Sequence, residues 1–165
     1  MSLRLDLTLA LLAICLLTAA SAAVAGNFAV TAMPGPDPSS WTFELFNNSD
    51  PADMLILSGL DLFWEDGVEI PAFTITSTPA GWVVNDQYNW PAWDAVGNEP
   101  ESGSSLPGFD VTTSIMPTKF TVWYYQLTDF LFEDGDVTTV PEPASMAAVL
   151  SGLAGLCAVV RRRRP

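Results

Sequence analysis

The 165-residue sequence contains no histidine, and its two cysteines, Cys15 and Cys157, lie in apolar stretches near the two ends. Without histidine the chain lacks the commonest general base and the commonest zinc ligand, so Ser-His and Cys-His catalytic arrangements are excluded. Without cysteine the central region cannot be held by a disulfide framework or by a thiolate metal cluster. Catalysis would have to rest on carboxylates, and the central domain must be stabilised by packing alone.

Basic residues are also scarce, because five of the six are Arg4 and the four arginines at 161–164, which leaves Lys119 alone between them. All but two of the 19 aspartates and glutamates lie in residues 26–140. A surface this acidic repels a phosphate backbone, so the sequence excludes nucleic acid as a partner. Divalent cations, cationic partners and neutral sugars remain compatible with this charge.

Residues 1–25 follow the three-part plan of a secretory signal peptide. Arg4 precedes an apolar run at 7–17, which is shorter than the roughly 20 residues that span a bilayer. Small residues follow, and Ala23 and Ala25 form the Ala-x-Ala pattern that signal peptidase admits. We predict export and cleavage after Ala25, with cleavage after Ala22 as the alternative.

The C-terminal segment has three parts in a fixed order. Pro141, Glu142 and Pro143 precede an apolar run at 144–160, which is near the short limit for a membrane span. The run ends at Arg161, Arg162, Arg163 and Arg164, and arginine clusters stay on the cytoplasmic side. We therefore expect a transmembrane helix at 144–160, a cytoplasmic stop at 161–164, and the domain at 26–140 outside the cytoplasm.

This segment, residues 141–165, resembles the PEP-CTERM sorting signal of Gram-negative bacteria in its box, its apolar stretch and its basic cluster. The resemblance implies that an exosortase, a membrane-embedded cysteine-peptidase-like enzyme of bacteria that make exopolysaccharide, recognises Pro141, Glu142 and Pro143. It implies transient anchoring in the inner membrane and a final location at the cell surface or outside the cell. The two prolines favour an extended, accessible backbone, which suits recognition by a peptidase. A plain linker before a single-pass anchor is the alternative.

The region between the two signals has the period-two pattern of β-strands. Apolar and polar residues alternate at 41–45 and 109–115. Further strands are expected at 27–32, 54–63, 69–77, 81–84 and 119–132, separated by clusters of Pro, Gly, Asn and Asp. Roughly seven strands with turns at this spacing predict an all-β protein: a single β-sandwich of jelly-roll or immunoglobulin-like type.

Two segments, 65–67 and 133–135, share the sequence Glu-Asp-Gly after an apolar run. One interpretation is a pair of hairpin turns, with Gly67 and Gly135 in the left-handed conformation. The other is calcium binding, because this hard cation prefers clustered carboxylates at turns, although the spacing matches no EF-hand loop. The candidate ligands are Glu65, Asp66 and Glu69 in one segment and Glu133, Asp134 and Asp136 in the other. Calcium is the only cofactor that the sequence suggests.

Trp82, Tyr88, Trp90 and Trp93 alternate with amide and carboxylate side chains. Aromatic faces beside directional hydrogen-bonding groups are what a sugar ring requires, so these four residues are candidate carbohydrate contacts. The alternative is a loop folded over the end of the sandwich, because most tryptophans of small domains lie in the core.

We expect an exported protein of the cell surface or extracellular matrix that is not an enzyme. Its partners would be signal peptidase and exosortase during export, and the membrane through its C-terminal helix. A carbohydrate-binding module that contacts extracellular polysaccharide is the alternative. An ice-binding surface, suggested by the alternating threonines at 74–78, and a small glycoside hydrolase are weaker alternatives.

Overall fold

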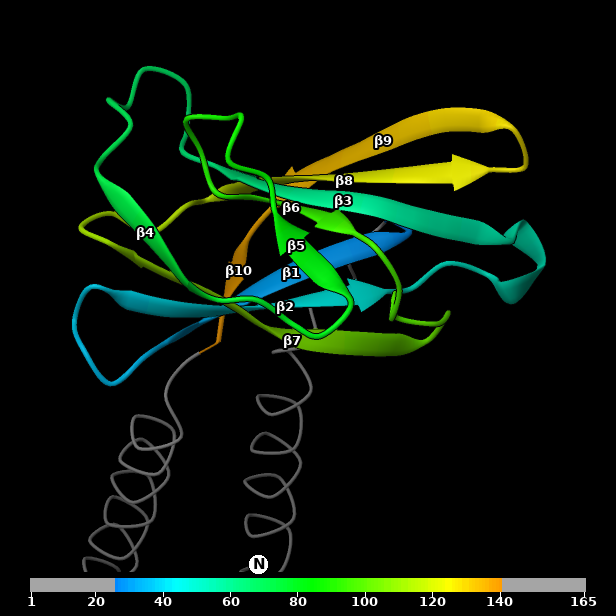
Figure 1. Cartoon of the computed structure of the whole chain (residues 1–165), viewed down its shortest axis with the longest axis horizontal. Coiled ribbons are helices and arrows are strands. Elements are labelled where there is room, and N and C mark those ends of the chain that lie inside the picture. The colour runs from blue at the N-terminus through cyan, green and yellow to red at the C-terminus, as the bar shows by residue number, and fades with distance from the viewer. Residues whose placement is uncertain (1–25, 141–165) are drawn as a thin grey trace, which may run out of the picture.

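Two five-stranded β-sheets form the part of the chain that the structure, a computed structural model, describes, which is residues 26–140 (Figure 1). Sheet A contains β1 (Phe28–Pro34), β2 (Ser40–Asn47), β4 (Phe73–Ser77), β7 (Ser104–Thr113) and β10 (Thr138–Thr139). Sheet B contains β3 (Leu55–Phe63), β5 (Trp82–Val84), β6 (Ala92–Ala95), β8 (Lys119–Gln126) and β9 (Asp129–Asp136). The predicted signal peptide at 1–25 and sorting segment at 141–165 lie outside the described residues.

The strand order is β10-β1-β2-β7-β4 in sheet A and β5-β6-β3-β8-β9 in sheet B. Neighbouring strands are antiparallel except for β1 and β10, which run parallel. The two sheets lie face to face, with β3, β8 and β9 in one layer and β1, β2 and β7 in the other (Figure 1). The predicted all-β sandwich is therefore confirmed.

Helical structure is slight in this range: η1 (Pro51–Asp53) is a single 3-10 turn. Among residues 26–140 no helix is long and apolar enough to cross a membrane. The membrane helix predicted at 144–160 lies outside the described residues, so it stays a prediction.

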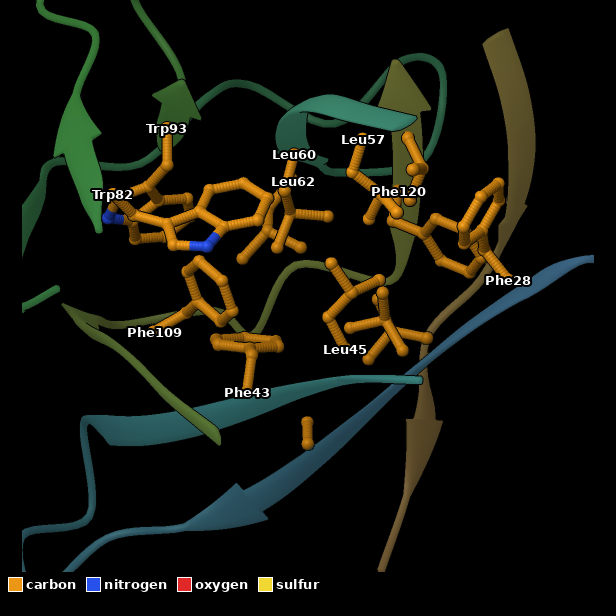
Figure 2. Close-up of a cluster of buried hydrophobic side chains, with 14 of the residues drawn as sticks. Phe28, Phe43, Leu45, Leu57, Leu60, Leu62, Trp82, Trp93, Phe109 and Phe120 are labelled. Atoms are coloured by element: carbon orange, nitrogen blue, oxygen red, sulfur yellow. The ribbon is translucent and has the colours of Figure 1, made fainter. Parts of the chain in front are cut away.

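The core lies between the two sheets and is rich in aromatic side chains (Figure 2). Phe43 and Phe109 of sheet A face Trp93 of sheet B, and all three are fully buried. The rings of Trp82 and Trp93 meet Phe109 edge-on at centroid distances of 5.1 and 5.3 Å. Burying each side chain of this size contributes about 1.5–3 kcal/mol to folding, so packing can hold a domain without disulfides.

Sheet B differs from the prediction at its β8–β9 edge. The expected single strand at 119–132 is a hairpin in which Gln126 pairs with Asp129, which leaves Leu127 and Thr128 as the loop. Leu127 has a φ of 59°, a conformation that hairpin loops usually give to Gly or Asn. The prediction was wrong because neither of these turn residues marks the loop. The strand β6 was not among the expected strands; it directly follows Pro91, which is fully buried.

The two Glu-Asp-Gly segments also differ from each other. Gly67 lies in a turn with a φ of 85°, as expected. Gly135 lies inside β9, and the prediction of a left-handed turn there was wrong. A Cβ atom on Gly135 would lie 2.5 Å from the ring of Phe120, its partner on β8. Glycine is required at this position for close approach to an aromatic ring, and not for backbone conformation.

Candidate functional site: the outer face of sheet B

The four aromatic residues predicted to contact a sugar divide into two groups. Trp82 is 4% exposed and Trp93 is 0% exposed, and both indoles point into the core (Figure 2). Their ring nitrogens are also occupied: Trp93 Nε1 donates to Thr78 Oγ1 at 3.1 Å, and Trp82 Nε1 donates to the Asn98 carbonyl at 3.3 Å. The hypothesis that these two residues contact a ligand is wrong, because strand pairing turns them inward.

Tyr88 and Trp90 have a different environment. They lie in the loop between β5 and β6, where their rings stack at 4.8 Å with an interplanar angle of 14°. Trp90 packs against Phe63 at 5.2 Å, and Tyr88 is 45% exposed. Tyr88 lines a hollow on the outer face of sheet B, together with residues of β3, β6, β8 and β9. Tyr88 therefore remains available to a ligand, whereas Trp90 is half-buried and packs against Tyr88 and Phe63.

A larger aromatic group lies on the same outer face, on the β8–β9 hairpin. Trp123 stacks on Phe130 at 5.5 Å with an interplanar angle of 11°, and Phe132 lies 5.3 Å from Trp123. Tyr125 completes the group at 5.0 Å from Phe130. Phe132 is 59% exposed and Phe130 is 53% exposed, although both are large apolar residues. We call Trp123, Tyr125, Phe130 and Phe132 the aromatic platform.

The strand register explains why the platform borders a hollow. Gly59 of β3 lies between Asp94 of β6 and Trp123 of β8, and Phe132 of β9 pairs with Trp123 on the other side. Because Gly59 has no side chain, the row of side chains across the sheet is interrupted between Asp94 and the indole. A hollow of about 150 Å³ lies there. Its lining residues are Ser58, Gly59, Asp61, Tyr88, Asp94, Trp123 and Phe130.

Asp61 is the polar centre of this hollow. Its carboxylate is buried and accepts a hydrogen bond of 2.9 Å from Trp123 Nε1, which fixes the orientation of the indole. Burial raises the pKa of Asp61 above 3.8; the hydrogen bond from Trp123 and the nearby Trp90 indole oppose this rise, and the Asp94 carboxylate adds to it. Trp90 Nε1 is also buried, and it donates no hydrogen bond of ordinary geometry to any acceptor among the described residues. Asp94 accepts a hydrogen bond of 3.0 Å from Asn85 Nδ2.

The sequence did contain a signal for the platform. Within 119–126 the aromatic residues Trp123 and Tyr125 lie two positions apart, which places them on one face of a strand. The pairing of these residues with Phe132 and Phe130 depended on a hairpin that no turn residue marked. Trp123, Tyr125, Phe130 and Phe132 were therefore missed as candidate site residues.

The predicted calcium ligands are only partly brought together. Asp66, Asp134 and Asp136 line a second pocket of about 540 Å³, but Lys119 lies in it as well and forms an ion pair with Asp136. Glu133 points elsewhere and accepts hydrogen bonds of 3.1 Å from the backbone nitrogens of Asn27 and Phe28. Glu65 and Glu69 do not line this pocket.

Across residues 26–140 the structure forms no group of three or more acidic side chains spaced to hold a metal ion. Calcium binding stays a prediction, and the Glu133 carboxylate is engaged by the backbone nitrogens of Asn27 and Phe28.

The residues predicted for sorting and processing lie outside the described residues. They are Ala23, Ala25, Pro141, Glu142, Pro143, Arg161, Arg162, Arg163 and Arg164.

Comparison with known families finds a match at the C-terminus, where residues 139–164 fit the family model of the PEP-CTERM protein-sorting motif. No curated protein matches the chain. Among solved structures, the chain is similar to a cohesin module from a Clostridium perfringens family 33 glycoside hydrolase. That similarity has 16% sequence identity and a TM-score of 0.36, and it covers 70% of this chain and 98% of the module. The sorting motif indicates an exported protein that is sorted by an exosortase.

Proposed function

We propose that this is a cell-surface or extracellular-matrix protein that acts by binding and not by catalysis. The observation that carries the proposal is the PEP-CTERM motif at 139–164, which directly follows a β-sandwich of acidic surface. An apolar segment with a signal-peptide plan at 1–25 supports the same route. The N-terminal segment would therefore direct the domain out of the cytoplasm, and the C-terminal motif would direct its sorting.

In this proposal the C-terminal segment works in three steps. Residues 144–160 hold the protein in the inner membrane, and Arg161 to Arg164 stay in the cytoplasm because moving them across hydrocarbon is costly. The Pro-Glu-Pro box at 141–143 then presents an extended backbone to the exosortase. In this proposal, processing releases the domain toward the cell surface, and a link between this sorting system and exopolysaccharide would bring the domain among glycans.

A binding role suits the described surface better than a hydrolytic one. Glycoside hydrolysis needs two carboxyl groups at a fixed separation on either side of the scissile bond. The carboxylates of the hollow, Asp61 and Asp94, each accept one hydrogen bond, from Trp123 and Asn85, and the hollow that they line measures about 150 Å³. A carbohydrate-binding role is the second candidate function, and the exposed aromatic platform favours it.

The test is mass spectrometry of both termini of the protein recovered from an exosortase-bearing bacterium. We expect an N-terminus that begins after Ala25 and a C-terminus that has lost the basic tail. In a strain without the exosortase, or with Glu142→Ala, the basic tail should be retained.

Glu101→Ala is the matched control, because it removes an exposed acidic residue outside the motif and should be processed normally. Identical C-termini in the strains with and without exosortase would contradict the proposal. Processing of Glu142→Ala at the normal site would indicate that the Pro-Glu-Pro box is a plain linker and is not recognised by the exosortase.

A further inference from the structure

We infer that the outer face of sheet B binds an uncharged polysaccharide, with the aromatic platform as its stacking surface and the adjacent hollow as its hydrogen-bonding site. The inference rests on the proposed function, because a protein delivered to the cell surface meets extracellular glycans. It assigns the ligand to a surface that includes only Tyr88 of the four residues predicted from sequence to contact a sugar.

The first support is the geometry of the platform. Trp123 and Phe130 stack at an interplanar angle of 11°, so each ring covers part of the other, and the exposed parts of Phe130 and Phe132 form the flat apolar surface along the hairpin. The apolar C–H face of a pyranose ring packs against such surfaces and removes them from water. Large apolar side chains that stay more than half exposed, as Phe130 and Phe132 do, normally mark an interaction site when they are contiguous.

The second support is that the platform is held in position before any ligand arrives. Asp61 fixes the Trp123 indole through the hydrogen bond to Nε1, and Asp61 itself is buried below the surface. The backbone of β8 is paired on both sides, with β3 and with β9. A rigid aromatic surface loses little conformational entropy when it binds, which favours affinity.

The third support is the polarity of the hollow beside the platform. The hollow has a volume of about 150 Å³. The exposed carboxylate of Asp94 can accept hydrogen bonds from sugar hydroxyls, the hydroxyls of Ser58 and Tyr88 can donate or accept, and the buried Asp61 lines the hollow as well. Charge-assisted acceptors at the edge of a stacking surface would set the orientation of the sugar ring.

Charge selects among the occupants of this face. Neither the platform nor the hollow contains a basic residue, and the whole chain carries a formal net charge of −13. An acidic polysaccharide would be repelled, and so would a second copy of the same acidic chain. An uncharged polysaccharide meets no such repulsion, so it is the occupant that these observations favour.

Affinity electrophoresis of the full-length chain tests the inference, in a zwitterionic detergent that carries no sugar. The gels contain hydroxyethyl cellulose, galactomannan or dextran as uncharged probes, and alginate as the acidic one. We expect at least one uncharged polysaccharide to retard the protein, and alginate to leave its mobility as in a gel without polysaccharide. Trp123→Ala should remove the retardation.

Phe132 provides the matched pair of variants. Phe132→Leu keeps an exposed apolar side chain but removes the ring, so it should lower the retardation, whereas Phe132→Tyr should preserve it. Both changes lie at a site that is 59% exposed, so folding should be unaffected even if Trp123→Ala is unstable. Ile115→Ala is the control for apolar exposure away from this face, because Ile115 is exposed and lies between β7 and β8.

Three results would overturn the inference. One is the absence of retardation by every uncharged probe, and another is equal retardation of wild type and Phe132→Leu. The third is a dimer of the wild type, seen by light scattering, that dissociates in Phe132→Leu, since this would assign the face to a second copy. If the C-terminus is still processed by the exosortase when binding fails, the proposed function stands and only the ligand assignment is lost.

Discussion

The two faces of sheet B use the same residue types for opposite purposes. On the inner face Trp93 is completely buried against Phe109, whereas on the outer face Trp123 lies beside two phenylalanines that are more than half exposed. Trp93 and its outward neighbour Asp94 are consecutive residues of β6, and successive side chains of a strand point to opposite faces. The position of an aromatic residue along its strand determines the face of the sheet to which it points. That face therefore determines whether the residue contributes to folding or is available to a ligand.

The inner face should give the largest loss of stability. Trp93→Ala is expected to lower the free energy of unfolding by about 3–5 kcal/mol, because it leaves a large cavity between the sheets. Trp123→Ala should cost less, about 1–3 kcal/mol, mostly from leaving the buried Asp61 carboxylate without its partner. Denaturant titration measures both, and equal losses would contradict the division between the faces.

A pair of glycines compares the faces through steric clash. Gly135→Ala on β9 should destabilise the fold by about 1–3 kcal/mol, because the new Cβ would meet the Phe120 ring at 2.5 Å. Gly59→Ala on the outer face should cost less, since its nearest contact is the Trp93 carbonyl at 3.1 Å. Thermal unfolding of both variants checks the order, and a larger loss for Gly59→Ala would reverse it.

Adjacent carboxylates on β9 provide a third comparison. Glu133→Ala is expected to cost about 1–2 kcal/mol, because this carboxylate accepts hydrogen bonds from the backbone nitrogens of Asn27 and Phe28 at the start of β1. Asp134→Ala, which removes an exposed carboxylate bonded to Thr121, should cost less. Hydrogen exchange of β1 amides should increase in the first variant only; equal exchange in the two would show that Glu133 does not hold β1.

The smallest effect concerns Asp61 and depends on pH. Because burial raises its pKa, the folded protein binds this proton more tightly than the unfolded chain does. The carboxyl therefore contributes stability below about pH 3.8, and this contribution is lost as pH rises through the folded pKa.

Asp61→Asn keeps an oxygen acceptor for Trp123 but does not titrate. We expect the free energy of unfolding of Asp61→Asn, relative to wild type, to increase between acidic and neutral pH. Chemical denaturation across this range measures the difference, and a difference that is constant or that falls with pH would contradict the expected direction.

The layered β-fold could be predicted from sequence because its signals are local. The alternation at 41–45 lies within β2, and that at 109–115 begins within β7, which ends at Thr113; clusters of Pro, Gly, Asn and Asp separate most of the strands. The β8–β9 hairpin could not be predicted, because its two-residue loop is Leu127 and Thr128. The calcium hypothesis was limited in the same way, since placing Glu133 against β1 depends on a contact between residues more than 100 positions apart.

The binding surface depended on pairing that the sequence does not reveal. Spacing alone grouped Trp82 and Trp93 with Tyr88 and Trp90, although the first two are core residues. The hollow forms only because Gly59, Trp123 and Asp94 come from three different strands of sheet B. The sorting motif could be recognised because all its parts are consecutive in the chain.

Cysteine labelling of intact cells tests the central claim most directly, which is that an exported sandwich presents the outer face of sheet B to the exterior. The variants Phe132→Cys and Val122→Cys, with Cys15 and Cys157 changed to Ser, are produced in an exosortase-bearing bacterium. They are then treated with a maleimide attached to a polyethylene glycol too large for porins. We predict that Phe132→Cys is labelled on cells or in their medium and that Val122→Cys, which is buried, is labelled only after unfolding. Labelling of Phe132→Cys only after the cells are lysed would contradict the account.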